Sequence, residues 1–328
     1  MRRLPMLLLA GALALAAAPS RAFDLQGHRG ARGLAPENTL PAFARALSVG
    51  VTTLELDVGL TRDGVLVVSH DPALNPDITR GPEGTFLAGR GPLIWHSTVQ
   101  ELQRYDVGRI NPASRYAQTF ASQQPVDGTR IPRLTELFAL VERAGAREVR
   151  FNIETKIDPR QPEATAAPEP FARALIAAIR EAGLARRATI QSFEWRTLQV
   201  VQREAPEIDT VYLSAQQRWL DNIGAGAAQD SPWTAGLRVA DHGSVPKMVK
   251  AAGGRVWSPH FGDLTPALRE EARALGLRVV VWTVNEPAAI ARMLDMSVDG
   301  IISDRPDLVR EALRARGMPL PRATPVTP

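Results

Sequence analysis

The stretch "TTLELDVGLTRDGVLVVSHD", residues 52–71, decides the fold of this chain. It holds two runs of β-forming residues, 52–58 and 65–70, and no helical pattern separates them. Residues 59–64 lie between the runs and end in "TRDG", whose Asp-Gly pair is a strong signal for a hairpin turn. We therefore expect residues 53–70 to form one strand of the main sheet that continues into an antiparallel hairpin.

Seven further β-rich runs alternate with amphipathic helical patterns, and this order favours a parallel sheet with crossover helices. The runs are residues 23–28, 148–154, 187–192, 209–214, 255–259, 277–283 and 299–303, and the main helical patterns are 41–50, 133–145, 170–183, 195–206, 266–276 and 287–297. Without the return strand of the hairpin, eight strands remain, which predicts an α/β fold of the (β/α)8 TIM-barrel type. An open doubly wound sheet is the alternative, but no strand is followed by a Rossmann-type glycine fingerprint.

Residues 71–130 do not follow this alternation of strands and helices. The segment is rich in proline and glycine and carries Trp95, Tyr105 and Tyr116. Long loops in compact domains are usually functional or disordered. We expect an insertion after the second barrel strand that caps the barrel mouth.

The hairpin predicts a position for three polar side chains. Glu55 and Asp57 are two residues apart, so they project from the same face of their strand. A turn centred on residues 62–64 places Asp71 opposite Glu55 and Ser69 opposite Asp57, which brings His70 beside both acids. Two inward carboxylates repel each other unless a cation or a shared proton lies between them. The alternative is that both face solvent on an exposed ribbon.

The same arrangement recurs at the ends of two other predicted strands. Glu154 and Lys156 follow one apolar run, and His28 and Arg29 follow another. In a (β/α)8 barrel these strand ends converge on the C-terminal face, where active sites lie. Three carboxylates without any cysteine suit Mg²⁺ or Ca²⁺ better than zinc. An arginine and a lysine beside such an ion form an anion clamp suited to phosphoryl transfer, and two histidines can serve as general acid and base.

Five motifs, taken together, resemble the glycerophosphodiester phosphodiesterase family. They are "HRGARGLAPENTLPAF", "ELDVGLTRDGVLVVSHD", "NIETK", "VVVWTVN" and "GIISDRP", and the resemblance spans residues 25–308. Membership implies a (β/α)8 barrel with a small insertion after the second barrel strand, and one divalent metal ion, Ca²⁺ or Mg²⁺. By position, it implies a catalytic pair in His28 and His70, metal ligands in Glu55, Asp57 and Glu154, and phosphate contacts by Arg29 and Lys156.

The resemblance implies hydrolysis of a small glycerophosphodiester to sn-glycerol 3-phosphate and an alcohol. One histidine deprotonates the attacking oxygen and the other protonates the leaving alcohol. The sequence leaves open which histidine plays which part, whether water or the neighbouring glycerol hydroxyl attacks, which ion binds, which head group is preferred and what the oligomeric state is.

Three further residues have two readings each. Glu37 either orients Arg29 or His28, or favours a helix N-terminus as an acidic residue. Trp282 either walls the glycerol pocket or packs in the core. His260 directly follows a predicted barrel strand. It either faces the substrate or merely lies in the loop that ends the strand, since the loops after barrel strands can do both.

Two other functions compete with hydrolysis of a small diester. A phospholipase-type phosphodiesterase that acts on intact lipid needs an apolar rim or a membrane-inserting loop. The predicted insertion has Phe86, Leu93, Ile94 and Trp95, but no unbroken hydrophobic stretch, so we expect no stable membrane insertion. A non-catalytic binding protein would be expected to have lost a histidine or a carboxylate, and all seven positions are filled.

The two ends of the chain differ from the barrel. Residues 1–22 have a basic start, an apolar run and small residues before Phe23, as in a secretory signal peptide cleaved after Ala22, which predicts an exported, periplasmic or secreted protein. We place the barrel at 23–316 and expect the proline-rich tail, 317–328, to be disordered.

Composition excludes several classes of function. Removing residues 1–22 takes three arginines from the 39 Lys+Arg, which leaves 36 against 35 Asp+Glu. A nearly neutral chain has no nucleic-acid footprint. The absence of cysteine excludes disulfides, thiolate metal sites and a cysteine nucleophile.

Overall fold

The structure is a computed structural model that describes residues 22–226 and 230–328, so the predicted leader lies outside it except for Ala22. Eight parallel strands close into a barrel, because β1 pairs with both β11 and β2. In order around the barrel they are β1 (Asp24–Gly27), β2 (Thr53–Leu60), β4 (Arg150–Thr155), β5 (Ala188–Ser192), β6 (Asp209–Ser214), β9 (Val256–Pro259), β10 (Arg278–Val281) and β11 (Gly300–Ser303). The predicted (β/α)8 TIM barrel is confirmed.

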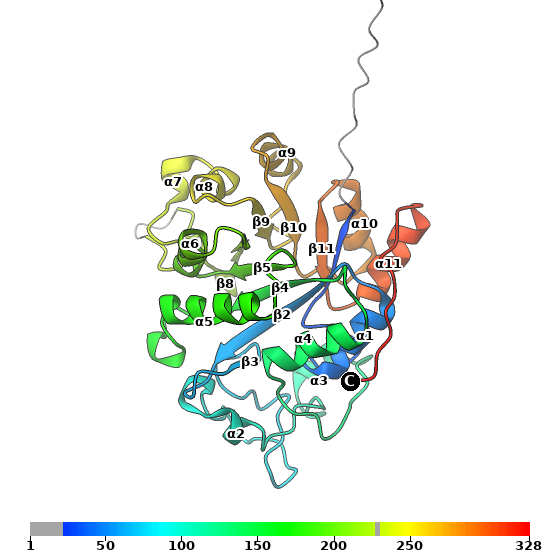
Figure 1. Ribbon diagram of the computed structural model, residues 1–328. Helices are drawn as coiled ribbons and strands as arrows, with labels where there is room; N and C mark the ends of the chain where they lie inside the picture. Colours follow the sequence, from blue (N-terminus) through cyan, green and yellow to red (C-terminus); the bar gives the residue numbers. More distant parts are fainter. Residues whose placement is uncertain (1–21, 227–229) are drawn as a thin grey trace, which may run out of the picture.

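Helices surround these strands (Figure 1). They are α1 (Leu40–Val49), α4 (Leu134–Arg143), α5 (Pro168–Glu181), α6 (Trp195–Glu204), α8 (Val245–Ala251), α9 (Pro266–Ala274), α10 (Pro287–Asp295) and α11 (Pro306–Ala315). Helices α8 and α11 are additional to the predicted ones. Short elements complete the described chain: α7 (Val239–His242), the 3-10 turns η1 (Ile94–His96) and η2 (Pro162–Ala164), and the strands β7 (Gln216–Gln217) and β8 (Leu220–Asp221).

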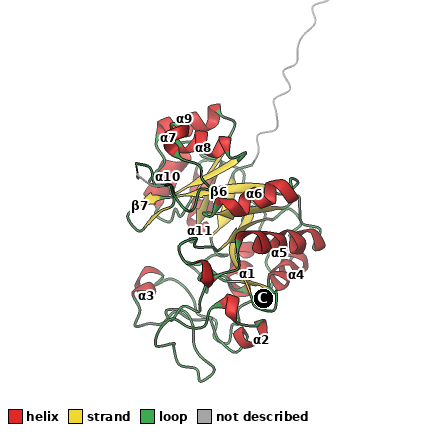
Figure 2. Cartoon of the chain, turned by 90° about the vertical axis from the view of Figure 1, so that its left-hand side faces the viewer, coloured by secondary structure: helices red, strands yellow, loops and turns green. Residues whose placement is uncertain are grey.

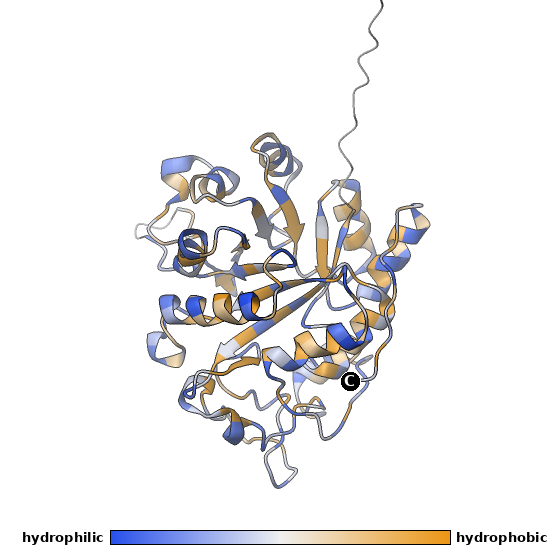
Figure 3. Ribbon diagram, viewed as in Figure 1, coloured by the Kyte–Doolittle hydropathy of each residue, from blue (hydrophilic) through white to orange (hydrophobic). Residues whose placement is uncertain are grey.

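Helix α1 shows how the sequence sets the helix limits. The Thr39 hydroxyl accepts a hydrogen bond from the amide of Ala42, and Pro41 stands in the first turn, where its missing N–H costs nothing. The helix ends at Gly50, whose φ of 87° is a conformation that glycine adopts without strain. Several helices carry one apolar and one polar side (Figure 3). The apolar sides pack on the barrel.

The predicted hairpin is present with the predicted register. Strand β3 (Leu66–Val68) runs antiparallel to β2, with Leu66 opposite Leu60. The pairing continues past β3, because the amide of Ser69 donates to the carbonyl of Asp57 at 3.0 Å. His70 follows directly and is thereby carried to the mouth of the barrel.

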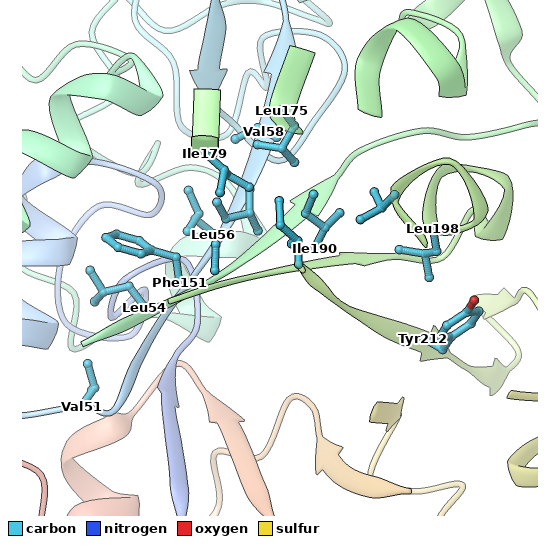
Figure 4. Close-up of a cluster of buried hydrophobic side chains, with 14 of the residues drawn as sticks. Val51, Leu54, Leu56, Val58, Phe151, Leu175, Ile179, Ile190, Leu198 and Tyr212 are labelled. Atoms are coloured by element: carbon cyan, nitrogen blue, oxygen red, sulfur yellow. The ribbon is translucent and has the colours of Figure 1, made fainter. Parts of the chain in front are cut away.

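Strand β2 has different side chains on its two faces. Leu54, Leu56 and Val58 belong to the main hydrophobic core between the barrel and its helices (Figure 4). The alternate residues Glu55 and Asp57 project into the barrel, where they are buried. The interpretation of the two acids as exposed on a ribbon is therefore wrong.

The barrel interior is polar on one side and apolar on the other. On the polar side, Gln26 and Gln191 both accept hydrogen bonds from the amide of Asn152, at 3.0 and 2.8 Å, and Gln191 continues this chain to Glu55. The apolar side is a separate cluster of Val211, Val256, Val280 and Ile302. The polar side therefore ends at the buried acids of β2.

The insertion between β3 and α4 contains η1, α2 (Val99–Leu102) and α3 (Arg115–Thr119) and otherwise consists of loops (Figure 2). It has a hydrophobic core of its own, which includes Leu74, Ile94, Leu102 and Ile131. Within residues 22–226 and 230–328, no helix has the length and apolar character needed to cross a bilayer.

The expectation of a disordered tail at 317–328 is wrong. The tail lacks helices and strands but lies against the barrel near α1 (Figure 1). Met318 and Leu320 pack on the main core, and the amide of Thr324 donates to the carbonyl of Leu47 at 2.9 Å. The prolines prevent a helix there, yet the apolar side chains between them still gain from burial.

Candidate active site

The seven predicted site residues meet at one cavity of about 510 Å³ at the carboxyl ends of the barrel strands. The cavity is lined by all of them: His28, Arg29, Glu55, Asp57, His70, Glu154 and Lys156. Four different segments contribute, namely the ends of β1, β2 and β4 and the segment after β3. The barrel and the hairpin therefore bring together residues that are up to 128 positions apart.

Three carboxylates form the centre of this site. Glu55 and Asp57 on β2 and Glu154 on β4 each offer an oxygen, and these oxygens all lie within 4.8 Å of one another. The parallel pairing of β2 and β4 sets this arrangement, because it places Asp57 beside Glu154. All three residues are buried. Buried carboxylate oxygens at this separation are the donor set that a hard divalent cation takes.

The protonation of this cluster reflects its crowding. Burial raises the pKa of Glu55 well above its usual range, and the charge of Asp57 raises it further. Burial also raises the pKa of Glu154, to about 7, against the opposing effect of Lys156. Burial would raise the pKa of Asp57 as well, but His70 and Lys156 hold it below its usual range. The three carboxylates thus oppose simultaneous ionisation, and a divalent cation would relieve their repulsion.

Hydrogen bonds from neighbouring groups fix two of the carboxylates. The Gln191 amide donates to Oε1 of Glu55 at 2.7 Å, and the backbone amide of Arg29 donates to Oε2 at 2.8 Å. The Asn38 amide donates to Oδ2 of Asp57 at 2.9 Å. Arg29 and Asn38 have φ values of 49° and 54°, which non-glycine residues rarely adopt. Such backbone strain clusters at functional sites.

His28 is oriented by Asp304, which follows β11. Its Nδ1 lies 2.6 Å from a carboxylate oxygen of Asp304, so the ring donates its Nδ1 proton there and leaves Nε2 toward the cavity. Arg32 and Asn285 hold the same carboxylate. Burial lowers the pKa of His28 to about 4, although Asp304 acts in the opposite direction. The ring is therefore neutral at neutral pH.

His70 has the same arrangement. Its Nδ1 lies 2.9 Å from Oδ1 of Asp71, and Asn75 donates to the other oxygen of that carboxylate at 2.8 Å. Burial lowers the pKa of His70, and the positive charges of Arg29 and Lys156 lower it further. Both histidines of the cavity therefore present a neutral ring with Nε2 available for proton transfer.

Two cations lie beside the carboxylates. Nζ of Lys156 lies 2.7 Å from Oε1 of Glu154. A guanidinium nitrogen of Arg29 lies 2.6 Å from Oε1 of Glu37. The other carboxylate oxygen of Glu37 accepts a hydrogen bond from the hydroxyl of Tyr116 in the insertion. Of the two readings of Glu37, orientation of Arg29 is the one that the geometry matches. The two cations stand where an anion that enters the cavity would meet them.

The sequence did not indicate four residues of this site. Asp304 and Asp71 each follow a predicted strand end directly, in "GIISDRP" and "SHD", and that position was the only available signal. Gln191 lies inside a strand, and nothing in the sequence marks it. Trp219 lies on the opposite wall of the cavity with Trp282, which the sequence did single out.

Comparison with known proteins gives a consistent result. Residues 28–308 match the Glycerophosphoryl diester phosphodiesterase family. A glycerophosphodiester phosphodiesterase of Caldanaerobacter subterraneus subsp. tengcongensis is 30% identical over 290 residues, which cover 88% of this chain and 97% of that protein.

Solved structures agree in fold. A provisionally named glycerophosphoryl diester phosphodiesterase of Silicibacter pomeroyi is 36% identical with a TM-score of 0.81, covering 92% of this chain and 96% of the other. A phosphodiesterase of Oleispira antarctica, solved with its product sn-glycerol-3-phosphate, has a TM-score of 0.62 at 22% identity and covers 88% and 96% of the two chains. The second likeness shows the shared barrel alone.

Proposed function

This chain belongs to the glycerophosphoryl diester phosphodiesterase family, and from that membership we propose that it hydrolyses glycerophosphodiesters to sn-glycerol 3-phosphate and an alcohol. The observation that carries the proposal is the make-up of the cavity. The cavity is lined by three buried carboxylates, two cations and two histidines, and each histidine is hydrogen-bonded to a further carboxylate. These are the groups that hydrolysis of a phosphodiester requires: charge to hold the phosphate, and an acid and a base to move protons.

The histidines are assigned the proton transfers. Nε2 of one neutral ring takes the proton of the attacking oxygen. The other ring must first carry a proton on both nitrogens, a charged form that the negative charge of a bound phosphate favours, and its Nε2 then gives a proton to the leaving alcohol. Asp304 and Asp71 hold the two rings in the required tautomer by accepting from Nδ1. Arg29 bears the positive charge that holds the non-bridging oxygens of the phosphate, together with Lys156.

Glu55, Asp57 and Glu154 are assigned to one divalent ion, Ca²⁺ or Mg²⁺. When bound, such an ion supplies positive charge that stabilises the phosphate oxygens as negative charge develops on them. The support is the buried donor set with oxygens within 4.8 Å of one another. Oxygen ligands of this kind serve both ions.

Action on intact lipid is less favoured by the insertion. Of its apolar residues, Ile94 is buried in the core of the insertion, and Trp95 packs against the main core. Phe86 is half-buried and lies beside the guanidinium of Arg80. These side chains are used for packing within the protein, so they do not form an apolar rim for a membrane.

Export is part of the proposal and rests on the leader-like residues 1–22. We expect the full chain expressed in bacteria to be found in the periplasm or the medium, with Phe23 as its first residue. Cell fractionation and N-terminal sequencing test this. Full-length protein retained in the cytoplasm would contradict it.

The activity is tested by coupling release of glycerol 3-phosphate from glycerophosphocholine to its oxidation by a dehydrogenase. We expect chelated protein to be inactive, Ca²⁺ or Mg²⁺ to restore the rate, and His70→Ala to abolish it. The matched control is His96→Ala, since His96 is exposed and does not line the cavity. Ion-loaded wild type that is inert here but releases head groups from intact lipid vesicles would instead support a phospholipase-type enzyme.

A further inference from the structure

The wall of the cavity opposite the carboxylates carries three aromatic rings that lie at right angles to one another. Trp219, His260 and Trp282 have ring centroids 5.4–6.0 Å apart and interplanar angles of 77–81°. They follow three successive barrel strands, β6, β9 and β10. We call these three residues the aromatic corner. Three rings that are nearly perpendicular to one another can surround a ligand group on adjoining sides.

In two of the rings, a ring nitrogen already has a hydrogen-bond partner within the protein. The indole N–H of Trp282 donates to the carbonyl of Ser258 at 2.9 Å. Nδ1 of His260 accepts from the amide of Gly262 at 3.2 Å, and burial lowers the pKa of His260, so this ring is neutral. The corner therefore has fixed ring orientations and offers an incoming group mainly aromatic surface.

Trp219 is a large apolar side chain that the protein leaves mostly exposed. It lies in the turn between β7 and β8, and its exposed fraction is 63%. Among the described residues only Val126 is another large apolar side chain classed as exposed. A tryptophan that the protein itself leaves uncovered at the rim of a cavity gains buried area when a ligand binds.

The charged groups near the corner are engaged elsewhere. Asp158 is paired with Arg160, and Asp263 accepts hydrogen bonds from Gln217 and from the amide of Gln216. In the neighbouring part of the wall, two other rings already have cations of the protein beside them. Arg160 lies 5.2 Å from the ring of Trp233, and Lys156 lies 5.8 Å from Phe193. The aromatic corner has no such cation of its own among the described residues.

We propose that the aromatic corner binds a quaternary ammonium group, so that the preferred substrate is a glycerophosphodiester whose alcohol carries a trimethylammonium head. A cation that methyl groups surround needs no hydrogen-bond acceptor and is attracted to the faces of aromatic rings. A primary ammonium has three N–H donors that need acceptors. The aromatic corner offers them no free carboxylate, and burying unpaired donors costs binding free energy. This inference rests on the proposed function and names the head group for the same cavity.

The sharpest test uses a pair of substrates that differ only in charge. Glycerophosphocholine is compared with glycerophospho-3,3-dimethylbutanol, in which carbon replaces the ammonium nitrogen, and glycerophosphoethanolamine serves as the primary amine. We expect kcat/KM to be roughly 10-fold higher for the choline ester than for the neutral isostere, from the typical strength of cation–π contacts. The ethanolamine ester should fall below the choline ester by at least as much.

Variants assign the preference to the corner. Trp219→Leu should bring the ratio of kcat/KM for the choline ester and its neutral isostere close to one, and Trp219→Phe should keep part of it. Folding is not at risk, because Trp219 is exposed. The matched control is Arg218→Ala in the same turn, which removes an exposed cation that does not line the cavity and should leave the ratio as in wild type.

The outcomes separate the two proposals. Ion-loaded wild type that hydrolyses none of the three esters overturns the proposed function. Equal rates on the choline ester and the neutral isostere overturn the head-group inference and leave the hydrolysis standing. A Trp219→Leu variant with an unchanged ratio but weaker binding to phosphatidylcholine vesicles would assign Trp219 to a lipid surface and also overturn the inference.

Discussion

Each of the two histidines depends on one carboxylate for its orientation. The contacts are His28 with Asp304 and His70 with Asp71, through Nδ1 in both cases. Asp304 also accepts hydrogen bonds from Arg32 and Asn285, so a substitution of Asp304 would disturb several contacts at once. Asp71 has fewer partners and is half-exposed, which makes it the better site for a test of orientation alone.

Asp71→Asn should lower kcat by roughly 10²–10⁴-fold, because a histidine that loses its orienting carboxylate can adopt the wrong tautomer. KM and the affinity for the divalent ion should change little, since Asp71 is not one of the three clustered carboxylates. Steady-state kinetics and ion titration measure both quantities. The matched control is Asp77→Asn in the same loop, and a loss of ion affinity equal to the loss of kcat would refute the orienting role.

Gln191 acts on the acid cluster from inside the barrel. Its amide donates to Oε1 of Glu55 at 2.7 Å, and Asn152 holds the amide oxygen of Gln191. Gln191→Met keeps the volume but removes the donor, so we expect ion affinity to fall roughly 10–100-fold, as for other groups that orient metal ligands. Calorimetric titration with Ca²⁺ or Mg²⁺ measures this.

A control for that experiment exists on the outside of the barrel. Gln202 donates to the hydroxyl of Thr210 and does not line the cavity. Gln202→Met should leave ion affinity at the wild-type value. Equal affinities in Gln191→Met and wild type would mean that Glu55 keeps its orientation through the amide of Arg29 alone.

At the level of elements, the sequence predicted the features that depend only on residues near one another in the chain. The Asp-Gly turn at residues 63–64 set the register of β2 with β3, and that register in turn placed His70 beside Asp57. Contacts that depend on the closure of the barrel were not predictable in this way. Asp304 meets His28 across 276 positions, because β1 and β11 are neighbours only when the barrel is closed.

The aromatic corner shows the same limit. Trp219 lies in a two-residue turn, and its partners His260 and Trp282 are 41 and 63 positions further along the chain. A lone tryptophan in a loop has no periodic pattern that could reveal its neighbours. The tail was wrongly predicted for a related reason, because proline-rich composition says nothing of the groove that receives it.

The tail makes an element-scale prediction. Deletion of residues 318–328 should lower the free energy of unfolding by roughly 2–4 kcal/mol, since Met318, Leu320 and Val326 are half-buried apolar side chains that pack on the main core. Urea denaturation followed by circular dichroism measures the change. Deletion of Thr327 and Pro328 alone, which are exposed, is the control and should have no effect. A long deletion that is equally harmless would restore the expectation of a disordered tail.

At the scale of the whole molecule, the acid cluster joins β2 and β4 at the mouth of the closed barrel. An ion held there binds the folded protein and not the unfolded chain. Ligand that binds only the native state raises the free energy of unfolding, by about 2.7 kcal/mol at a concentration 100 times Kd. The ion should therefore stabilise the entire barrel against heat.

That stabilisation should depend on pH in a defined direction. Burial raises the pKa of Glu154 to about 7, so in the ion-free protein this carboxyl binds a proton below that pH, and the ion must displace the proton to bind. The ion-induced rise in Tm should be larger at pH 8 than at pH 6, because Glu154 takes up a proton as pH falls through about 7. Thermal unfolding at pH 8 and pH 6, with and without Ca²⁺, measures it. In Glu154→Gln the ion-induced rise in Tm should be smaller and should lose the part of its pH dependence that Glu154 contributes. An equal rise in Tm at both pH values in wild type would mean that Glu154 does not hold the ion.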